Sequence, residues 1–249
     1  ANGFPLSRAV MASSCVPYGF TPITIGAAFV RGKYDDCEQK PEPPKLIDGG
    51  VYDNQGAHKL SQDKSRFHCD YIVVSDAGNG KVNAMGTTHF FNLAMNTISM
   101  MMNRIKKMQR SDNLYEGVTE KEHFAYVPLE WDCSERLLQG FVNNLRNGNV
   151  HPDVWQAHGI SEAEISALKT KGTPRTEAET TIMQHIKANV AWSKFEECAP
   201  SAESVDLARH VGTSLVALSA AQIDALIAHS AWLAELQTRL YLPMLVEQG

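Results

Sequence analysis

The chain has 249 residues, enough for one or two domains with a sizeable core. Its 43% hydrophobic and 20% charged residues are the proportions of an ordinary globular protein. A net charge of −5 without a basic stripe excludes a typical nucleic-acid-binding surface, and no apolar run is long enough to cross a membrane. Five scattered cysteines without a Cys-x-x-Cys favour reduced thiols in a cytosol-like compartment. The compartment itself stays open, as does peripheral association with a membrane.

The first predicted element is a helix over residues 5–15, with Pro5 in its first turn. Pro17 ends it. Ser13 and Ser14 fall at the end of this helix, without the strand–turn–helix pattern of a nucleophile elbow, so we expect at most a supporting role beside a site. One face of the helix is predicted to carry Leu6, Ala9, Val10 and Ser13.

Short β-type runs follow at residues 23–25 and 27–30, and a polar, proline-rich stretch over 31–44 is predicted to be an exposed loop. Within the loop, Asp35, Cys37 and Glu38 match no tetrahedral metal spacing, so we expect a solvated segment and no metal.

A short strand ending at Asp48 comes next, followed by Gly49 and Gly50. The pattern predicts that the strand delivers a carboxylate to its end, and that the glycines let the backbone pass close behind it. Asp53 and Asn54 are turn residues that redirect the chain.

Two histidines lie near this turn. His58 is predicted to cap or line a short helix over Ala57–Leu60, with a catalytic triad as the alternative. His68 and Cys69 precede a strand over Tyr71–Ser75, and a nucleophilic Cys–His pair is the weaker alternative there. Asp76 follows, at the carboxyl end of the strand, where α/β sheets bind ligands.

The next predicted helix, over residues 89–109, has a methionine-rich apolar stripe that includes Met101, Met102 and Met108. We expect it to pack in a core, with a lipid-facing role as the alternative. A basic cluster around Lys106 and Lys107 is predicted to be a solvated helix end. The last strand, Phe124–Leu129, is predicted to lie at a sheet edge because of Pro128.

Beyond Cys133 the pattern is helical. Capping boxes at Ser161/Glu164 and Ser219/Gln222 open two helices, the first stopping near Gly172. Another helix is predicted from Thr173 to about Phe195, and His229 is expected to be a packing residue of the last helix. We therefore predict two parts, residues 1–133 and a helical extension over 134–249.

Three stretches together resemble the patatin-like phospholipases. Leu46–Asn54 resembles the aspartate box of that family, Ala9–Pro17 the helix-to-loop segment before it, and Tyr71–Gly78 the next core strand. They occur in the expected order, and the resemblance covers about residues 5–80.

The resemblance implies an α/β fold: the second half of a mostly parallel sheet in a three-layer sandwich, here with the helical extension. It also implies a serine hydrolase that cleaves acyl esters of lipids with a Ser-Asp dyad and no cofactor. Asp48 would be the catalytic aspartate, Gly49 and Gly50 its supporting loop, and Ser13, Ser14, Asn54 and Asp76 neighbouring residues.

The family's G-x-S-x-G serine and glycine-rich oxyanion loop are missing from the sequence. We therefore expect an upstream segment or a partner chain to supply them, with a lipid or acyl ester as substrate and transient contact with a membrane surface. The alternative hypothesis is a catalytically dead module that binds a protein or a membrane. A thiol or metal hydrolase built on His68 and Cys69 is the third.

Overall fold

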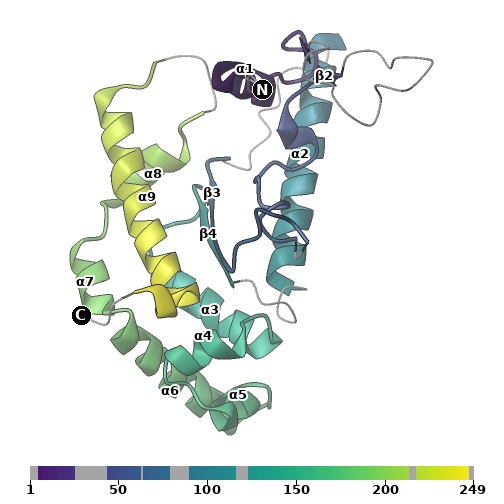
Figure 1. Ribbon diagram of the computed structural model, residues 1–249. Helices are drawn as coiled ribbons and strands as arrows, with labels where there is room; N and C mark the ends of the chain where they lie inside the picture. Colours follow the sequence, from purple (N-terminus) through teal and green to yellow (C-terminus); the bar gives the residue numbers. More distant parts are fainter. Residues whose placement is uncertain are drawn as a thin grey trace. The chain divides into compact units, whose positions relative to one another are not determined.

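The computed structural model describes residues 5–25, 44–62, 64–78, 90–115, 123–212 and 217–246 (Figure 1). Its contacts divide the chain into two compact units. Unit 1 comprises Ala1–His58 and Lys81–Met108, and unit 2 comprises Lys59–Gly80 and Gln109–Gly249. The units do not coincide with the predicted parts 1–133 and 134–249, which remain a prediction.

Unit 1 begins with the predicted helix, α1 (Leu6–Ser13). The four residues predicted to share a face are all exposed, whereas Ala12 and Cys15 are buried. The main chain after α1 hydrogen-bonds to a later segment, and small side chains allow that close approach. The predicted strand regions are very short: β1 (Ile23–Thr24) pairs antiparallel with β2 (Lys45–Leu46). The predicted strand at 27–30 and the acidic stretch at 35–38 lie outside the described residues.

The methionine-rich helix is confirmed as α2 (Phe90–Tyr115), which continues beyond its predicted end. Ile98 is buried and Met102 half-buried, but Met101 and Met108 are exposed. Successive helix residues are about 100° apart, so a single face cannot bury the whole predicted stripe. Of the basic cluster, Lys107 is exposed as predicted for a solvated helix end, whereas Lys106 is buried, which corrects the prediction at that position.

Unit 2 contains a parallel pair of strands, β3 (Tyr71–Asp76) and β4 (His123–Pro128), so the chain is of the α/β type. Parallel strands need a long connection, and α2 lies between them in the sequence. All six residues of β4 are buried, whereas β3 alternates between exposed and buried. In the described part of the chain β4 pairs with β3 alone, as the predicted edge position requires.

The helical part of unit 2 follows β4. The predicted capping boxes are present at Ser161/Glu164 and Ser219/Gln222. The helices are α3 (Arg136–Asn147), α4 (Pro152–Ala157), α5 (Glu162–Leu168), α6 (Thr173–Asn189), α7 (Trp192–Glu197), α8 (Ala202–Arg209) and α9 (Ala220–Tyr241), with the short turn η4 (Pro243–Leu245) after them.

Two helix ends differ from the prediction. The helix opened by Ser161 stops at Leu168, before Gly172. The helix from Thr173 breaks at Ala191, whose φ of 57° is left-handed, and α7 follows. The break turns Trp192 and Phe195 onto Trp232 of α9, with ring centroids 6.1 and 5.5 Å away. Tertiary packing of aromatic rings therefore overrides the helical pattern there.

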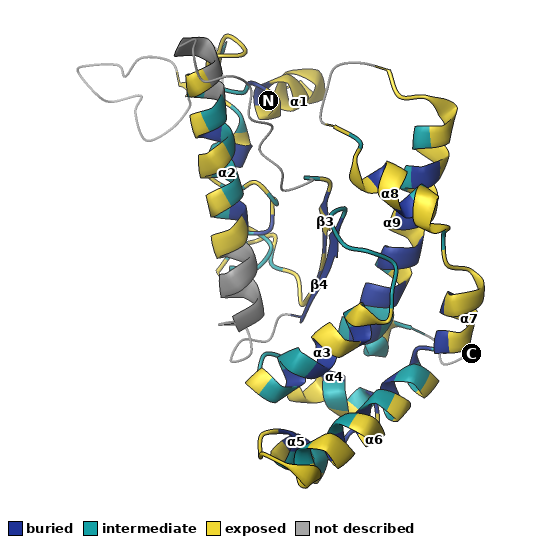
Figure 2. Cartoon of the chain, turned by 180° about the vertical axis from the view of Figure 1, so that it is seen from behind, coloured by how far each residue is buried: buried dark blue, intermediate teal, exposed yellow. Residues whose placement is uncertain are grey.

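Helix α9 lies against β4 and α8 and carries much of the core of unit 2 (Figure 2). His229 is fully buried, as expected of a packing residue, and its Nε2 donates to the carbonyl of Trp131 over 2.8 Å. In the same way His158 Nε2 donates to the carbonyl of Leu240 over 2.9 Å. Two buried histidine rings thus donate to backbone carbonyls far away in the sequence, one from α9 and one to α9.

Leu236→Ala tests the role of α9 in the core. Leu236 is 0% exposed, so we expect the variant to lose about 2–5 kcal/mol of unfolding free energy in urea titrations. Ile227→Ala, on the same helix but 61% exposed, is the control and should change it by less than about 0.5 kcal/mol. Equal losses in the two variants would contradict this packing.

The pH dependence of stability tests the buried histidine. Burial lowers the pKa of His158, because a second proton would have to sit on Nδ1, which is buried and has no hydrogen-bond partner among the described residues. The unfolded chain then binds more protons than the folded chain below about pH 6.5. The contribution of His158 to stability is therefore complete above that pH and is lost as the pH falls.

We expect His158→Gln, which keeps a donor but cannot titrate, to flatten the decline in unfolding free energy between about pH 7 and 5.5. A slope identical to that of the unmodified chain would show that His158 is not the titrating group.

Candidate functional site

Asp48 lies just beyond β2, in unit 1. Its backbone N–H donates to the carbonyl of Cys15 over 2.9 Å, directly after α1, and β2 itself pairs with β1. Three local segments therefore fix the position of this residue. The side chain is half-buried.

The Asp48 carboxylate caps the turn that follows it. Oδ1 accepts a hydrogen bond from the N–H of Gly50 over 2.7 Å, at the start of the 3-10 turn η2 (Gly49–Val51). Oδ2 accepts no hydrogen bond from any residue that the structure describes. One oxygen thus orients the carboxylate, and the other can accept a proton from a nearby hydroxyl.

Gly50 is the position at which the chain passes close to other groups. A Cβ there would lie against Cε of Met102, 2.7 Å from Asn54 Oδ1 and 3.0 Å from Asp48 Oδ1. At Gly49 a Cβ would have nothing within 4 Å. The sequence did not single out Met102 as a neighbour of this turn; its place in the stripe of α2 was the available signal.

The predicted short helix over Ala57–Leu60 is wrong, because these residues form turns. The backbone N–H of His58 donates to Asp53 Oδ2 over 2.9 Å, and this bond holds the chain in a compact turn. The His58 ring lies edge-on to Tyr52, with Nε2 3.4 Å from the phenol oxygen. These contacts place the ring beside Tyr52, whereas the triad alternative placed it beside Asp48.

The two candidate serines are in the same unit as Asp48. Ser13 is the last residue of α1 and is exposed. Ser14 is exposed too, and its Oγ donates back to the carbonyl of Val10 over 3.0 Å. That bond is a common helix-end contact, so the Ser14 hydroxyl is engaged within the helix and is not presented as a nucleophile.

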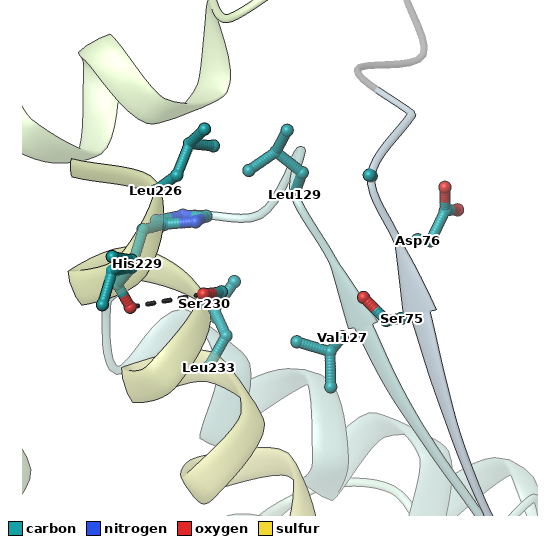
Figure 3. A pocket seen from close by; sticks show the side chains of 10 residues that line it. Ser75, Asp76, Val127, Leu129, Leu226, His229, Ser230 and Leu233 are labelled. Atoms are coloured by element: carbon teal, nitrogen blue, oxygen red, sulfur yellow. Dashed lines mark hydrogen bonds between the residues drawn. The ribbon is translucent and has the colours of Figure 1, made fainter. Parts of the chain in front are cut away.

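Asp76 lies in unit 2, at the carboxyl end of β3. It is buried, and its Oδ1 accepts a hydrogen bond from the N–H of Gly78 over 3.0 Å. It borders a mainly apolar cavity of about 190 Å³ between the strand ends and α9, which Figure 3 shows. The cavity is also lined by Ser75, Ala77, Val127, Leu129, Leu226, Ile227, His229, Ser230 and Leu233.

The Cys–His alternative has little geometric support. His68 Nε2 lies 3.5 Å from Asp70 Oδ1, while Cys69 Sγ donates to the carbonyl of Phe67 over 3.4 Å. Cys133 is also a poor nucleophile, because burial raises the pKa of its thiol to about 12. The four cysteines in the described residues are all free thiols. Among the described helices, none combines the length and apolar character needed to cross a bilayer.

No family model, no curated protein and no solved structure matches the chain. The geometry of the Asp48 turn is therefore the main structural support for a functional hypothesis.

Gly50→Ala tests the close approach at the turn. The added methyl group must displace Met102, Asn54 or the Asp48 carboxylate, so we expect a loss of about 1–3 kcal/mol of unfolding free energy. Gly49→Ala is the matched control, and because space is open there it should change stability by less than about 0.5 kcal/mol. Urea unfolding measures both, and two equal effects would contradict the crowding at Gly50.

Proposed function

We propose that the chain provides the aspartate of a patatin-like lipid acyl hydrolase, with Asp48 as the base of a Ser-Asp dyad. The observation that carries the proposal is the Asp48 carboxylate, held by the Gly50 amide at 2.7 Å through one oxygen only. The serine of a G-x-S-x-G elbow and the oxyanion donors come from an upstream segment or a partner chain. In this proposal the parallel pair β3–β4 belongs to a patatin-like three-layer sandwich.

The chemistry assigns Asp48 one task in each half of the reaction. As the serine oxygen attacks the ester carbonyl, its proton passes to the free oxygen of Asp48. The protonated carboxyl then gives that proton to the departing alcohol. Water next attacks the acyl-serine, Asp48 takes its proton, and the acid leaves as the serine regains a hydrogen.

The Gly50 hydrogen bond supports this role by fixing the direction of the carboxylate without a third residue. A base that is already oriented needs no rearrangement at the moment of proton transfer. Half-burial also removes part of the water that would otherwise compete for the free oxygen.

Asp48→Asn tests the proposal in the protein that also contains the serine-bearing segment. The asparagine oxygen can still accept from Gly50, so the turn should persist while the base is lost. We expect ester hydrolysis to fall by about 10²–10⁴-fold. Asp224→Asn, an exposed residue of α9, is the control and should keep full activity. Retained turnover in Asp48→Asn would overturn the proposal.

The exposed methionines of α2 favour one second candidate, a catalytically inactive module that binds a protein or membrane surface. Met100, Met101 and Met108 are each more than half exposed, and methionine adapts to varied partners. Labelling with a fluorophosphonate probe separates the two functions. A labelled serine supports the hydrolase, and a protein that takes no label but binds lipid vesicles supports the module.

A further inference from the structure

Three metal-binding side chains converge in unit 2, away from the Asp48 turn in the sequence. His123 is the first residue of β4, His151 is the N-cap of α4, and Asp153 lies in the first turn of α4. Each offers one ligand atom, and these atoms all lie within 4.8 Å of one another. Imidazole nitrogens with one carboxylate oxygen form a ligand set typical of zinc and other divalent transition metals.

Packing holds the His123 ring in place. It is buried, stacks on Tyr71 at 5.4 Å between centroids, and meets the edge of the His151 ring at 4.9 Å. Its nitrogens make no hydrogen bond to any residue in the described part of the chain. A buried imidazole normally has a polar partner, and among the described residues this oriented ring has none.

His151 and Asp153 already have the spacing of neighbouring ligands. His151 Nδ1 lies 3.5 Å from Asp153 Oδ2. Around a tetrahedral zinc with bonds of about 2.0–2.1 Å, neighbouring ligand atoms are about 3.4 Å apart. The same nitrogen accepts from the backbone N–H of Asp153 at 3.3 Å, a long bond that a metal would replace.

We propose that His123, His151 and Asp153 bind one divalent transition metal ion, with zinc as the best match. Two neutral imidazoles and one carboxylate supply three ligands, and water completes the tetrahedron. The ion connects the start of β4 to the start of α4, and so joins the sheet to the helical part of unit 2. This site is independent of the ester hydrolase chemistry, and the sequence predicted no metal because its ligands come from separate elements.

The experiment is a zinc titration of the full chain after removal of metals with a chelator, read by competition with a chromogenic chelator. We expect about one tight equivalent and a rise in melting temperature when zinc is added. The variants are Asp153→Ala, which changes an exposed side chain, and His151→Ala, which changes a half-buried one and also removes the side-chain cap of α4. His123→Gln is a third variant, which keeps a polar group at the buried position.

The control is His210→Ala. His210 Nδ1 lies 3.2 Å from Asp206 Oδ1, so it forms a histidine–carboxylate pair without a second described histidine. Each variant of the proposed ligands should weaken zinc binding at least about 10-fold, since even residues that only support a ligand contribute that much. The His210 variant should bind as the unmodified chain does.

Absence of a stoichiometric site would overturn the proposal. An equal loss of zinc affinity in the ligand variants and in His210→Ala would also overturn it, because that result would indicate adsorption of zinc to surface histidines. Cobalt provides a second readout, since its visible spectrum distinguishes tetrahedral from octahedral coordination. An octahedral spectrum unaffected by Asp153→Ala would also contradict the proposed ligand set.

Discussion

Burial of helix α9 is the constraint on which unit 2 depends. The helix packs on β4, and its leucines join the apolar residues of α3, α5 and α6 in one core. Around this apolar contact, polar groups are paired across long stretches of sequence, as at His229 with Trp131 and at Trp232 with Phe195. Because β4 lies against α9, the positions of both ends of this strand follow from the same packing. One end borders the cavity beside Asp76, and the other carries His123.

The Asp48 turn must both orient a carboxylate and leave one of its oxygens free. A carboxylate that caps a turn is held rigidly, but a carboxylate that acts as a base needs a free lone pair. The geometry separates these tasks between Oδ1, which accepts from Gly50, and Oδ2. Crowding by Met102 and Asn54 leaves space only for glycine at position 50, so the turn and the direction of the carboxylate are specified together.

Elements whose ends are marked by local sequence signals could be predicted. Such elements are the helices opened by the capping boxes at Ser161 and Ser219, the strand from Tyr71, and α2. The break at Ala191 could not be predicted, because it results from the contact of Trp192 with a helix far along the chain. For the site, the sequence indicated Asp48 and its glycines, while the group around His123 exists only after β4 and α4 meet.

The hydrogen bonds that anchor α9 have an unequal effect on how the sequence can vary. The carbonyls of Trp131, Phe195 and Leu240 accept them, and a carbonyl is present whatever the side chain. The donors, in contrast, are the specific rings of His229, Trp232 and His158. Hydrogen bonding therefore places no demand on the side chains at the acceptor positions, where apolar packing of the buried Phe195 and Leu240 is the remaining constraint. The donor positions must satisfy the packing and also keep a ring N–H. During divergence of this chain, apolar replacements of similar size should therefore be more frequent at the acceptor positions than at the donor positions.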